Sequence, residues 1–123
     1  MIKIKRVYEK PSKDDGFRIL IDRLWPHGLS KEKAKIHLWL KDVAVSSELR
    51  KWFSHDPQKW TQFKRRFYAE LRPKKDAIAM ILDKVKTEAN VTLLYASKEE
   101  KFNNAVALLE YINSKLKKKA VQK

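Results

Sequence analysis

The sequence contains no cysteine and only two glycines, and these absences exclude several kinds of protein. Without cysteine there is no disulfide framework, no thiolate metal site and no cysteine nucleophile. The glycine-rich phosphate loop, the nucleophile elbow and the paired-carboxylate motif are also missing. The three histidines, at positions 27, 37 and 55, have spacings that match no zinc pattern. We therefore expect neither a metal nor a cofactor.

Long hydrophobic runs are absent as well. No apolar stretch approaches the roughly 20 residues that span a bilayer. At the N-terminus, Lys3 and Lys5 interrupt the apolar residues, so no signal segment is recognisable. These features predict a soluble, unexported, cytoplasmic protein with no membrane partner.

Acidic residues are scarce relative to basic ones. There are 15 Asp and Glu against 29 Lys and Arg, which gives a formal net charge of +14 at pH 7. Such a field attracts polyanions, and nucleic acid above all. A surface rich in Lys and Glu can also reflect adaptation to high temperature, where ion-pair networks are favoured. Such a surface would not need so large an excess of basic over acidic residues. We predict nucleic acid or a phosphorylated ligand as the partner and leave the oligomeric state open.

The length bounds the domain organisation. A chain of 123 residues, 43% of them hydrophobic, is long enough to bury one core and too short for two. We predict a single domain over residues 1–118, followed by a basic tail over 119–123 that frays.

Three segments have the pattern of β-strands. Residues 2–8 begin with strict alternation, as in an edge strand. Residues 17–21 end in three successive apolar residues, and residues 91–96 form a continuous run that is β-branched at its start, as in strands covered on both faces. Only about eight residues separate the first two strands, so they are either parallel or a hairpin. The stretch 37–40 is ambiguous between helix and extended chain.

Helices are expected between the second and the last strand, and after the last strand. Four of them have predicted N-caps, and one further helix is expected after Pro73. The caps are Ser30, Ser46 or Ser47, Asp56 before Pro57, and Ser97 in a capping box with Glu100. The order of the elements predicts an α/β fold, a single small domain with a mainly parallel sheet of about three strands flanked by helices.

A crevice is expected beyond the carboxyl ends of the strands, where ligands bind in open α/β sheets. This rule selects residues 22–28 after the second strand and residues 97–98 after the last. Asp22 is the only acid in its loop, and it can act as a catalytic general base. The alternative is that Asp22 only caps the turn or holds Arg23.

Four residues near this crevice are candidates for binding a ligand. Arg23 offers a planar fork suited to phosphate, or else forms a surface ion pair. Trp25 can stack on a base or sugar, or else pack the loop down. Lys98 adds charge at the expected start of the last helix, where an anion can sit. Further along, Asn103 or its neighbour Asn104 faces the crevice.

The third predicted helix carries a basic stripe. Its cations resemble a phosphate-tracking surface, although a solvated amphipathic helix has the same pattern. The residues of the stripe are Lys59, Lys64, Arg65, Arg66 and Arg72.

A family resemblance rests on three stretches: ILIDRLWPHGLSKEKA, WLKDVAVSSELRKWFSHDPQKW with FKRRFYAEL, and TLLYASKEEKFNNAVALL. Together they resemble the YeaO-like branch of the domain of unknown function 488 family over nearly the whole chain. The resemblance implies a small cytoplasmic protein and brings no established activity. The family's recurring residues fall here on Asp22, Arg23, Leu24, Trp25, Pro26, Gly28, Lys98 and Asn103.

The chain departs from the family pattern in three places. His27 stands where arginine is usual, Val45 where proline is usual, and Phe102 where the last motif usually has histidine. A catalytic histidine at that last position would therefore be missing. A larger branch of the family has a cysteine after its last strand, and a covalent cysteine mechanism is excluded for this chain.

Three functional hypotheses follow. The first is an anion-binding crevice for a nucleotide or nucleic acid between residues 22–28 and 97–103, with or without catalysis by Asp22. The second is a hydrolase or transferase acting on a small metabolite or a base–sugar bond, with Asp22 as general base and Arg23 positioning an anion. The third is a protein-interaction module, for which ordinary core packing is the alternative, built on Trp39, Trp52, Phe53 and Trp60.

Overall fold

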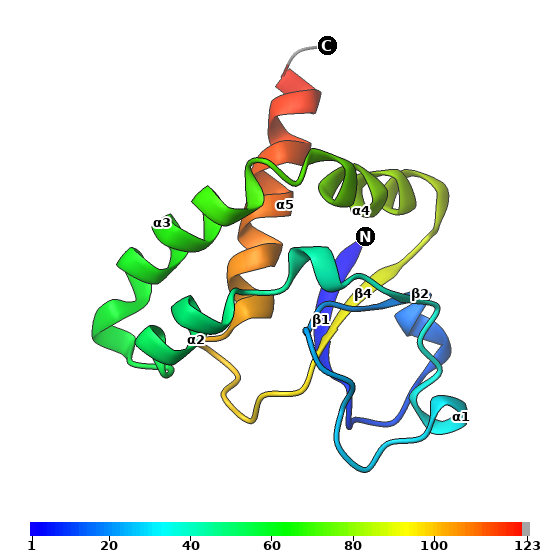
Figure 1. Cartoon of the computed structure of the whole chain (residues 1–123). Coiled ribbons are helices and arrows are strands. Elements are labelled where there is room, and N and C mark those ends of the chain that lie inside the picture. Colours follow the sequence, from blue (N-terminus) through cyan, green and yellow to red (C-terminus); the bar gives the residue numbers. More distant parts are fainter. Residues whose placement is uncertain (122–123) are drawn as a thin grey trace.

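The computed structural model describes residues 1–121 and contains one four-stranded sheet with helices packed against it (Figure 1). Every strand pairing is parallel, and the strand order is β1-β4-β2-β3. The strands are β1 (Ile2–Arg6), β2 (Phe17–Leu20), β3 (Leu38–Trp39) and β4 (Val91–Tyr95). The predicted α/β class, single small domain and mainly parallel sheet are confirmed, with four strands instead of about three.

The additional strand, β3, comes from the stretch that the sequence left ambiguous. The backbone N–H of His37 donates to the carbonyl of Arg18, and that of Leu40 donates to the carbonyl of Leu20, both at 2.9 Å. These bonds on either side of the two-residue strand hold it at the edge of β2. Tertiary pairing therefore settles a conformation that local pattern does not.

The first two strands run parallel without being neighbours, so the hairpin alternative is wrong. β4 lies between them, with Leu93 paired to both Ile4 and Ile19. The connection between β1 and β2 ends at Gly16, whose φ is +61°. A Cβ there would lie 2.1 Å from the carbonyl oxygen of Asn90, so only glycine allows this approach to the start of β4.

Over residues 1–121, five α-helices and three short 3₁₀ turns complete the fold. The helices are α1 (Lys31–Ala34), α2 (Ser47–Phe53), α3 (Trp60–Leu71), α4 (Lys75–Thr87) and α5 (Asn104–Val121), and the turns are η1 (Lys13–Asp15), η2 (Lys41–Val43) and η3 (Pro57–Lys59). The main core joins the sheet to α2, α3, α4 and α5. Phe53 is buried in this core, and Trp52 and Trp60 pack against it. Three of the four aromatic residues considered for protein docking therefore pack in or against the core.

The other face of the sheet is covered by the chain that follows β2. Leu20 and Leu94 point to this side and form a small second cluster with Val7. Trp25 and Trp39 pack over that cluster. The loop after β2 is therefore anchored in a small core of its own at the end of the sheet.

The last helix starts later than expected. The predicted capping box of Ser97 and Glu100 is wrong, because α5 begins at Asn104. Residues 97–103 form a loop in which side chains satisfy the backbone. The Glu99 carboxylate accepts from the N–H groups of Lys101 (2.9 Å) and Phe102 (3.2 Å). Lys98 consequently lies in this loop and not in a first helical turn.

A buried ionic cluster lies at the start of β2. Asp15 is only 1% exposed, and its carboxylate contacts Arg18, which is 2% exposed. Lys5 and Lys3 of β1 lie 3.1 and 3.4 Å from the same carboxylate. The Arg18 guanidinium also donates to the carbonyl of Ala34 at 2.8 Å. This cluster ties β1, β2 and the end of α1 together.

The C-terminal tail that the sequence sets apart, residues 119–123, extends past the described residues. No helix in the described part of the chain is long and apolar enough to cross a membrane.

Candidate functional site

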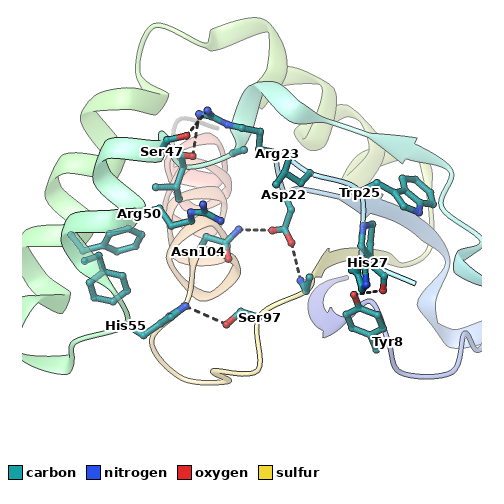
Figure 2. A pocket seen from close by; sticks show the side chains of 17 residues that line it. Tyr8, Asp22, Arg23, Trp25, His27, Ser47, Arg50, His55, Ser97 and Asn104 are labelled. Atoms are coloured by element: carbon teal, nitrogen blue, oxygen red, sulfur yellow. Dashed lines mark hydrogen bonds between the residues drawn. The ribbon is translucent and has the colours of Figure 1, made fainter. Parts of the chain in front are cut away.

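A cavity of about 540 Å³ lies beyond the carboxyl ends of β2 and β4, where α2 and the start of α5 converge on it (Figure 2). This is the position that the strand-end rule selects. Its volume is within the range of pockets that hold small organic ligands. Its polar lining consists of Tyr8, Asp22, Arg23, His27, Ser47, Arg50, His55, Ser97 and Asn104.

Asp22 holds the framework of the cavity together. One carboxylate oxygen accepts from the backbone N–H of Ala96, at the end of β4, at 2.8 Å. The other accepts from the Asn104 side-chain amide, at the start of α5, at 2.9 Å. The carbonyl of Asp22 accepts in turn from the indole N–H of Trp39 at 2.7 Å. Asp22 therefore joins the second strand, the last strand and the last helix.

The electrostatic setting of Asp22 differs from that of an exposed carboxyl. Burial raises the pKa of Asp22, and this effect exceeds the opposing influence of the Asn104 and Ala96 hydrogen bonds and of the positive charge on Arg50. Asp22 is also the only acidic residue that lines the cavity. The one negative charge of the site is thus enclosed by hydrogen-bond donors.

Two arginines supply positive charge. Arg23 donates to the hydroxyl of Ser47 at 2.7 Å and lies 3.5 Å from the carbonyl of Val45. Arg50 extends from α2 toward Asn104 and Asp22 in Figure 2. Among the described residues Arg50 has no salt-bridge partner within 4.0 Å. Its guanidinium is therefore available to an anion in the cavity.

His55 reaches the cavity through an unusual turn. Ser54 and His55 have φ values of 46° and 56°, so two successive left-handed residues end α2 and redirect the chain. The Nδ1 of His55 lies 2.8 Å from the carbonyl oxygen of Phe102 and must carry a proton there. Its Nε2 faces the Ser97 hydroxyl at 3.4 Å. The imidazole thus links the loop after α2 to the loop after β4.

An apolar wall faces these polar groups. Phe53 and Phe63 stack with ring centroids 4.1 Å apart, and both line the cavity. Leu24, which is 66% exposed, lies at the rim. Because Phe53 and Phe63 are almost fully buried, a flat ring on a ligand would contact chiefly Leu24 and the partly exposed Trp25.

The structure brings together three of the five predicted site residues. Asp22, Arg23 and Trp25 line the cavity, whereas Lys98 and Asn103 do not. The indole N–H of Trp25 donates to the carbonyl of Leu29 at 2.6 Å, and its ring packs edge-on against Trp39. Trp25 therefore anchors its loop, as in the second of the two roles expected for it, in which it packs the loop down.

Lys98 and Asn103 are replaced in the lining by their neighbours. Asn103 is fully buried; its amide donates to the carbonyl of Glu99 at 2.6 Å, and its oxygen accepts from the N–H of Val106 at 2.9 Å. Those bonds cap α5. The adjacent residues, Ser97 and Asn104, are the ones that face the cavity.

Sequence reasoning missed the contribution of α2. Ser47 and Arg50 on α2 and His55 in the loop after it line the cavity, yet they directly follow none of the predicted strands and so fall outside the rule that selected the site. A signal was nonetheless present, because all three lie in the stretch SSELRKWFSHDP that carries the family resemblance. In the described part of the chain, no group of three or more metal-ligating side chains is placed to hold a metal ion.

Comparisons with known proteins agree on one family. The family model described as the inactive DUF488-N3 subclade matches residues 1–123. The chain is 36% identical over 115 residues to "Uncharacterized protein Rv3073c" of Mycobacterium tuberculosis, which covers 93% of this chain and 95% of that protein. It is 35% identical over 113 residues to "Uncharacterized protein YeaO" of Escherichia coli, covering 92% and 97%. No solved structure matches the chain. The predicted family is thus confirmed, and the chain is a YeaO-like member of the DUF488 family, in the branch described as the inactive DUF488-N3 subclade.

Proposed function

We propose that this protein binds a phosphorylated ligand with a flat ring, namely a nucleotide or a nucleotide unit of a nucleic acid, in the cavity beyond β2 and β4. The observation that carries the proposal is the charge of the lining. Arg23 and Arg50 face a cavity whose only carboxylate, Asp22, already accepts from two N–H donors. An incoming phosphate therefore meets guanidinium groups whose charge the Asp22 carboxylate neutralises only in part.

The rest of the lining supports the same ligand class. Leu24 and the partly exposed Trp25 offer apolar surface in the same cavity for a base. Asn104 is the first residue of α5, so the positive end of that helix dipole lies at the cavity and favours an anion. The net charge of +14 attracts such ligands from solution.

A second candidate is a hydrolase or transferase with Asp22 as general base. The raised pKa of Asp22 inside a cavity favours it, since catalytic acids and bases often carry such shifts. Two observations favour binding instead. Each Asp22 oxygen already accepts a hydrogen bond, and the matching family branch is described as inactive. A protein-docking role is supported less, because the central aromatic residues Trp52, Phe53 and Trp60 are engaged in the core.

Replacing Arg50 by glutamine is expected to weaken nucleotide binding about tenfold or more, because a charge-assisted hydrogen bond to phosphate contributes about 1.5–3 kcal/mol. Adenosine monophosphate and adenosine are titrated calorimetrically against the wild type and against Arg50→Gln. The matched control is Arg65→Gln, which removes the same charge from an exposed position of α3 outside the cavity.

The wild type should bind the monophosphate at least about tenfold more tightly than the nucleoside, and less tightly as salt rises. The control should bind like the wild type. Equal affinity for nucleoside and nucleotide, or equal losses in both variants, would overturn the proposal. The proposal would also be overturned if none of the four common nucleotides bound to the wild type.

A further inference from the structure

A second hollow, of about 470 Å³, runs between α3 and α5. It shares no lining residue with the cavity beyond the strand ends. The two helices are joined along it by the Tyr68 hydroxyl, which donates to the carbonyl of Ala107 at 2.9 Å, and by the ion pair between Lys64 and Glu110 at 3.2 Å. The groove is therefore a formed feature between two packed helices.

Positive charge dominates this groove. Among the described residues, four cations line it and Glu110 is the only acid. Lys64 takes up the charge of Glu110. The other three cations, Arg72, Lys115 and Lys118, have no salt-bridge partner within 4.0 Å among the described residues. Lys115 and Lys118 are three residues apart on α5 and so lie on one face of that helix.

Two tyrosines form the floor beneath the cations. The rings of Tyr68 and Tyr111 are tilted against each other with centroids 5.0 Å apart, and Lys115 lies 5.2 Å from the Tyr111 ring. Burial, assisted by the nearby Glu110, raises the pKa of Tyr68 to about 12. The Tyr68 hydroxyl thus stays neutral and adds no negative charge to the groove.

We propose that the groove between α3 and α5 holds the phosphate backbone of a single-stranded nucleic acid. Three uncompensated cations over an aromatic floor combine the two elements by which proteins track a strand without reading its sequence. An anionic membrane is the other class of surface that seeks cations, but it also takes up exposed apolar side chains. The exposed large hydrophobic residues of the described chain are Met1, Tyr8, Leu24 and Met80, and none lies on α3 or α5.

This proposal stands independently of nucleotide binding in the first cavity, because the two sites share no residue. It also extends the basic stripe noted in the sequence. Lys64 and Arg72 belong to that stripe, and α5 supplies the facing cations. A groove made by both helices distinguishes a strand-binding surface from a merely solvated helix.

The test measures fluorescence anisotropy of a labelled single-stranded DNA of about 12 nucleotides, at salt concentrations from about 50 to about 200 mM. The groove variant is Arg72→Gln/Lys115→Gln/Lys118→Gln. The matched control, Lys13→Gln/Lys31→Gln/Lys33→Gln, removes the same charge from exposed positions on η1 and α1. Each phosphate contact contributes about 0.7 to the logarithmic salt dependence for single strands, so losing three should lower the slope by about 2.

We expect the groove variant to lose about a hundredfold in affinity at the lower salt and about sixfold at the higher, and the control to keep the wild-type slope. Equal losses in both variants would overturn the proposal, since net charge alone would then account for binding. If the groove variant lost binding to phosphatidylserine vesicles but still bound the single-stranded DNA like the wild type, the proposal would also be overturned. The groove would then be a membrane-binding surface. Titration with adenosine monophosphate separates the two sites, because the groove variant should bind it like the wild type and the Arg50→Gln variant should not.

Discussion

Asp15→Asn is expected to lower the free energy of unfolding by about 3–5 kcal/mol, because it breaks a buried ion pair from one side. Arg18, only 2% exposed, would keep its charge with no carboxylate beside it. Asparagine keeps one oxygen for the backbone N–H of Ser12, but its NH2 group replaces the oxygen that Lys5 and Lys3 approach at 3.1 and 3.4 Å. Urea denaturation near neutral pH measures the effect. The control is Glu110→Gln, since the exposed Lys64–Glu110 pair should contribute at most about 1 kcal/mol.

The same contribution should depend on pH. Burial alone would raise the pKa of Asp15, but the Ser12 backbone hydrogen bond, Lys5 and Arg18 together lower it from 3.8 to about 2. Because the folded pKa lies below the unfolded one, the ionised Asp15 stabilises the fold fully above about 3.8. That stabilisation, about 2 kcal/mol, is lost as the pH falls from 3.8 toward 2.

The stability gap between wild type and Asp15→Asn should therefore narrow by about 1 kcal/mol between pH 6 and pH 3. Asparagine does not titrate, so the variant supplies the baseline for all other carboxyls. A gap that stays constant down to pH 3 would show that Asp15 is not held ionised by its neighbours. A gap below about 1 kcal/mol at pH 6 would show that Arg18 finds another way to be solvated.

The fold was largely predictable because its main signals are local. Apolar residues predominate in Phe17–Leu20 and Val91–Tyr95, as in strands covered on both faces, and those two strands are neighbours inside the sheet. β3 was not predictable, since a two-residue strand has no periodicity and is held by tertiary contacts, chiefly its backbone bonds to β2. The order of β1, β4 and β2 depends on contacts between residues far apart in sequence, which pattern alone does not encode.

The start of α5 shows a second limit of local reasoning. Ser97 and Glu100 have the spacing of a capping box, but Glu99 captures the loop amides of Lys101 and Phe102. The same residue types cap a helix or satisfy a loop, and the choice depends on where the chain must go next. Here Asn103 becomes the cap, its amide satisfying the loop and the helix at once.

The candidate site also contains residues that local sequence patterns could locate and residues that they could not. The strand-end rule located Asp22 and Arg23, because it needs only the end of a buried strand. It could not locate Arg50, which reaches the cavity only because α2 is held in place by tertiary contacts. Ser46, the cap of α2, donates its hydroxyl and its N–H to Glu70 of α3 at 2.6 and 3.0 Å. A site built by packing between helices is visible in sequence only through its motifs.

Asp22 connects the end of β2 to the end of β4 and the start of α5, because its carboxylate accepts hydrogen bonds from Ala96 and Asn104. Its position does not decide between a structural and a catalytic role, since a general base would occupy the same place. The two roles differ in which property matters. Positioning requires an acceptor toward Ala96 and complementary groups toward Asn104, whereas catalysis requires the carboxylate itself at position 22.

Asp22→Asn is expected to lower the free energy of unfolding by about 1–3 kcal/mol, because its new amide group meets a donor at either Ala96 or Asn104. Asn104→Asp should cost a similar amount, since it places two carboxylates side by side. An exposed asparagine on the same helix supplies the control, as Asn113→Asp should change stability by less than about 0.5 kcal/mol. Chemical denaturation gives the free energy of unfolding of each single variant, which a double-mutant cycle requires.

The double variant Asp22→Asn/Asn104→Asp should recover most of the lost stability and the nucleotide binding of the wild type. The exchanged amide can donate to the exchanged carboxylate while its oxygen still accepts from Ala96, so both hydrogen bonds return with donor and acceptor reversed. The relocated charge also lies at the first residue of α5, where the helix dipole favours it. Additive losses in the cycle would show that these bonds do not hold the site together. If instead the wild type proves to turn over a substrate, and the double variant is stable but inert, the carboxylate at position 22 is catalytic and a purely positioning role for Asp22 is wrong.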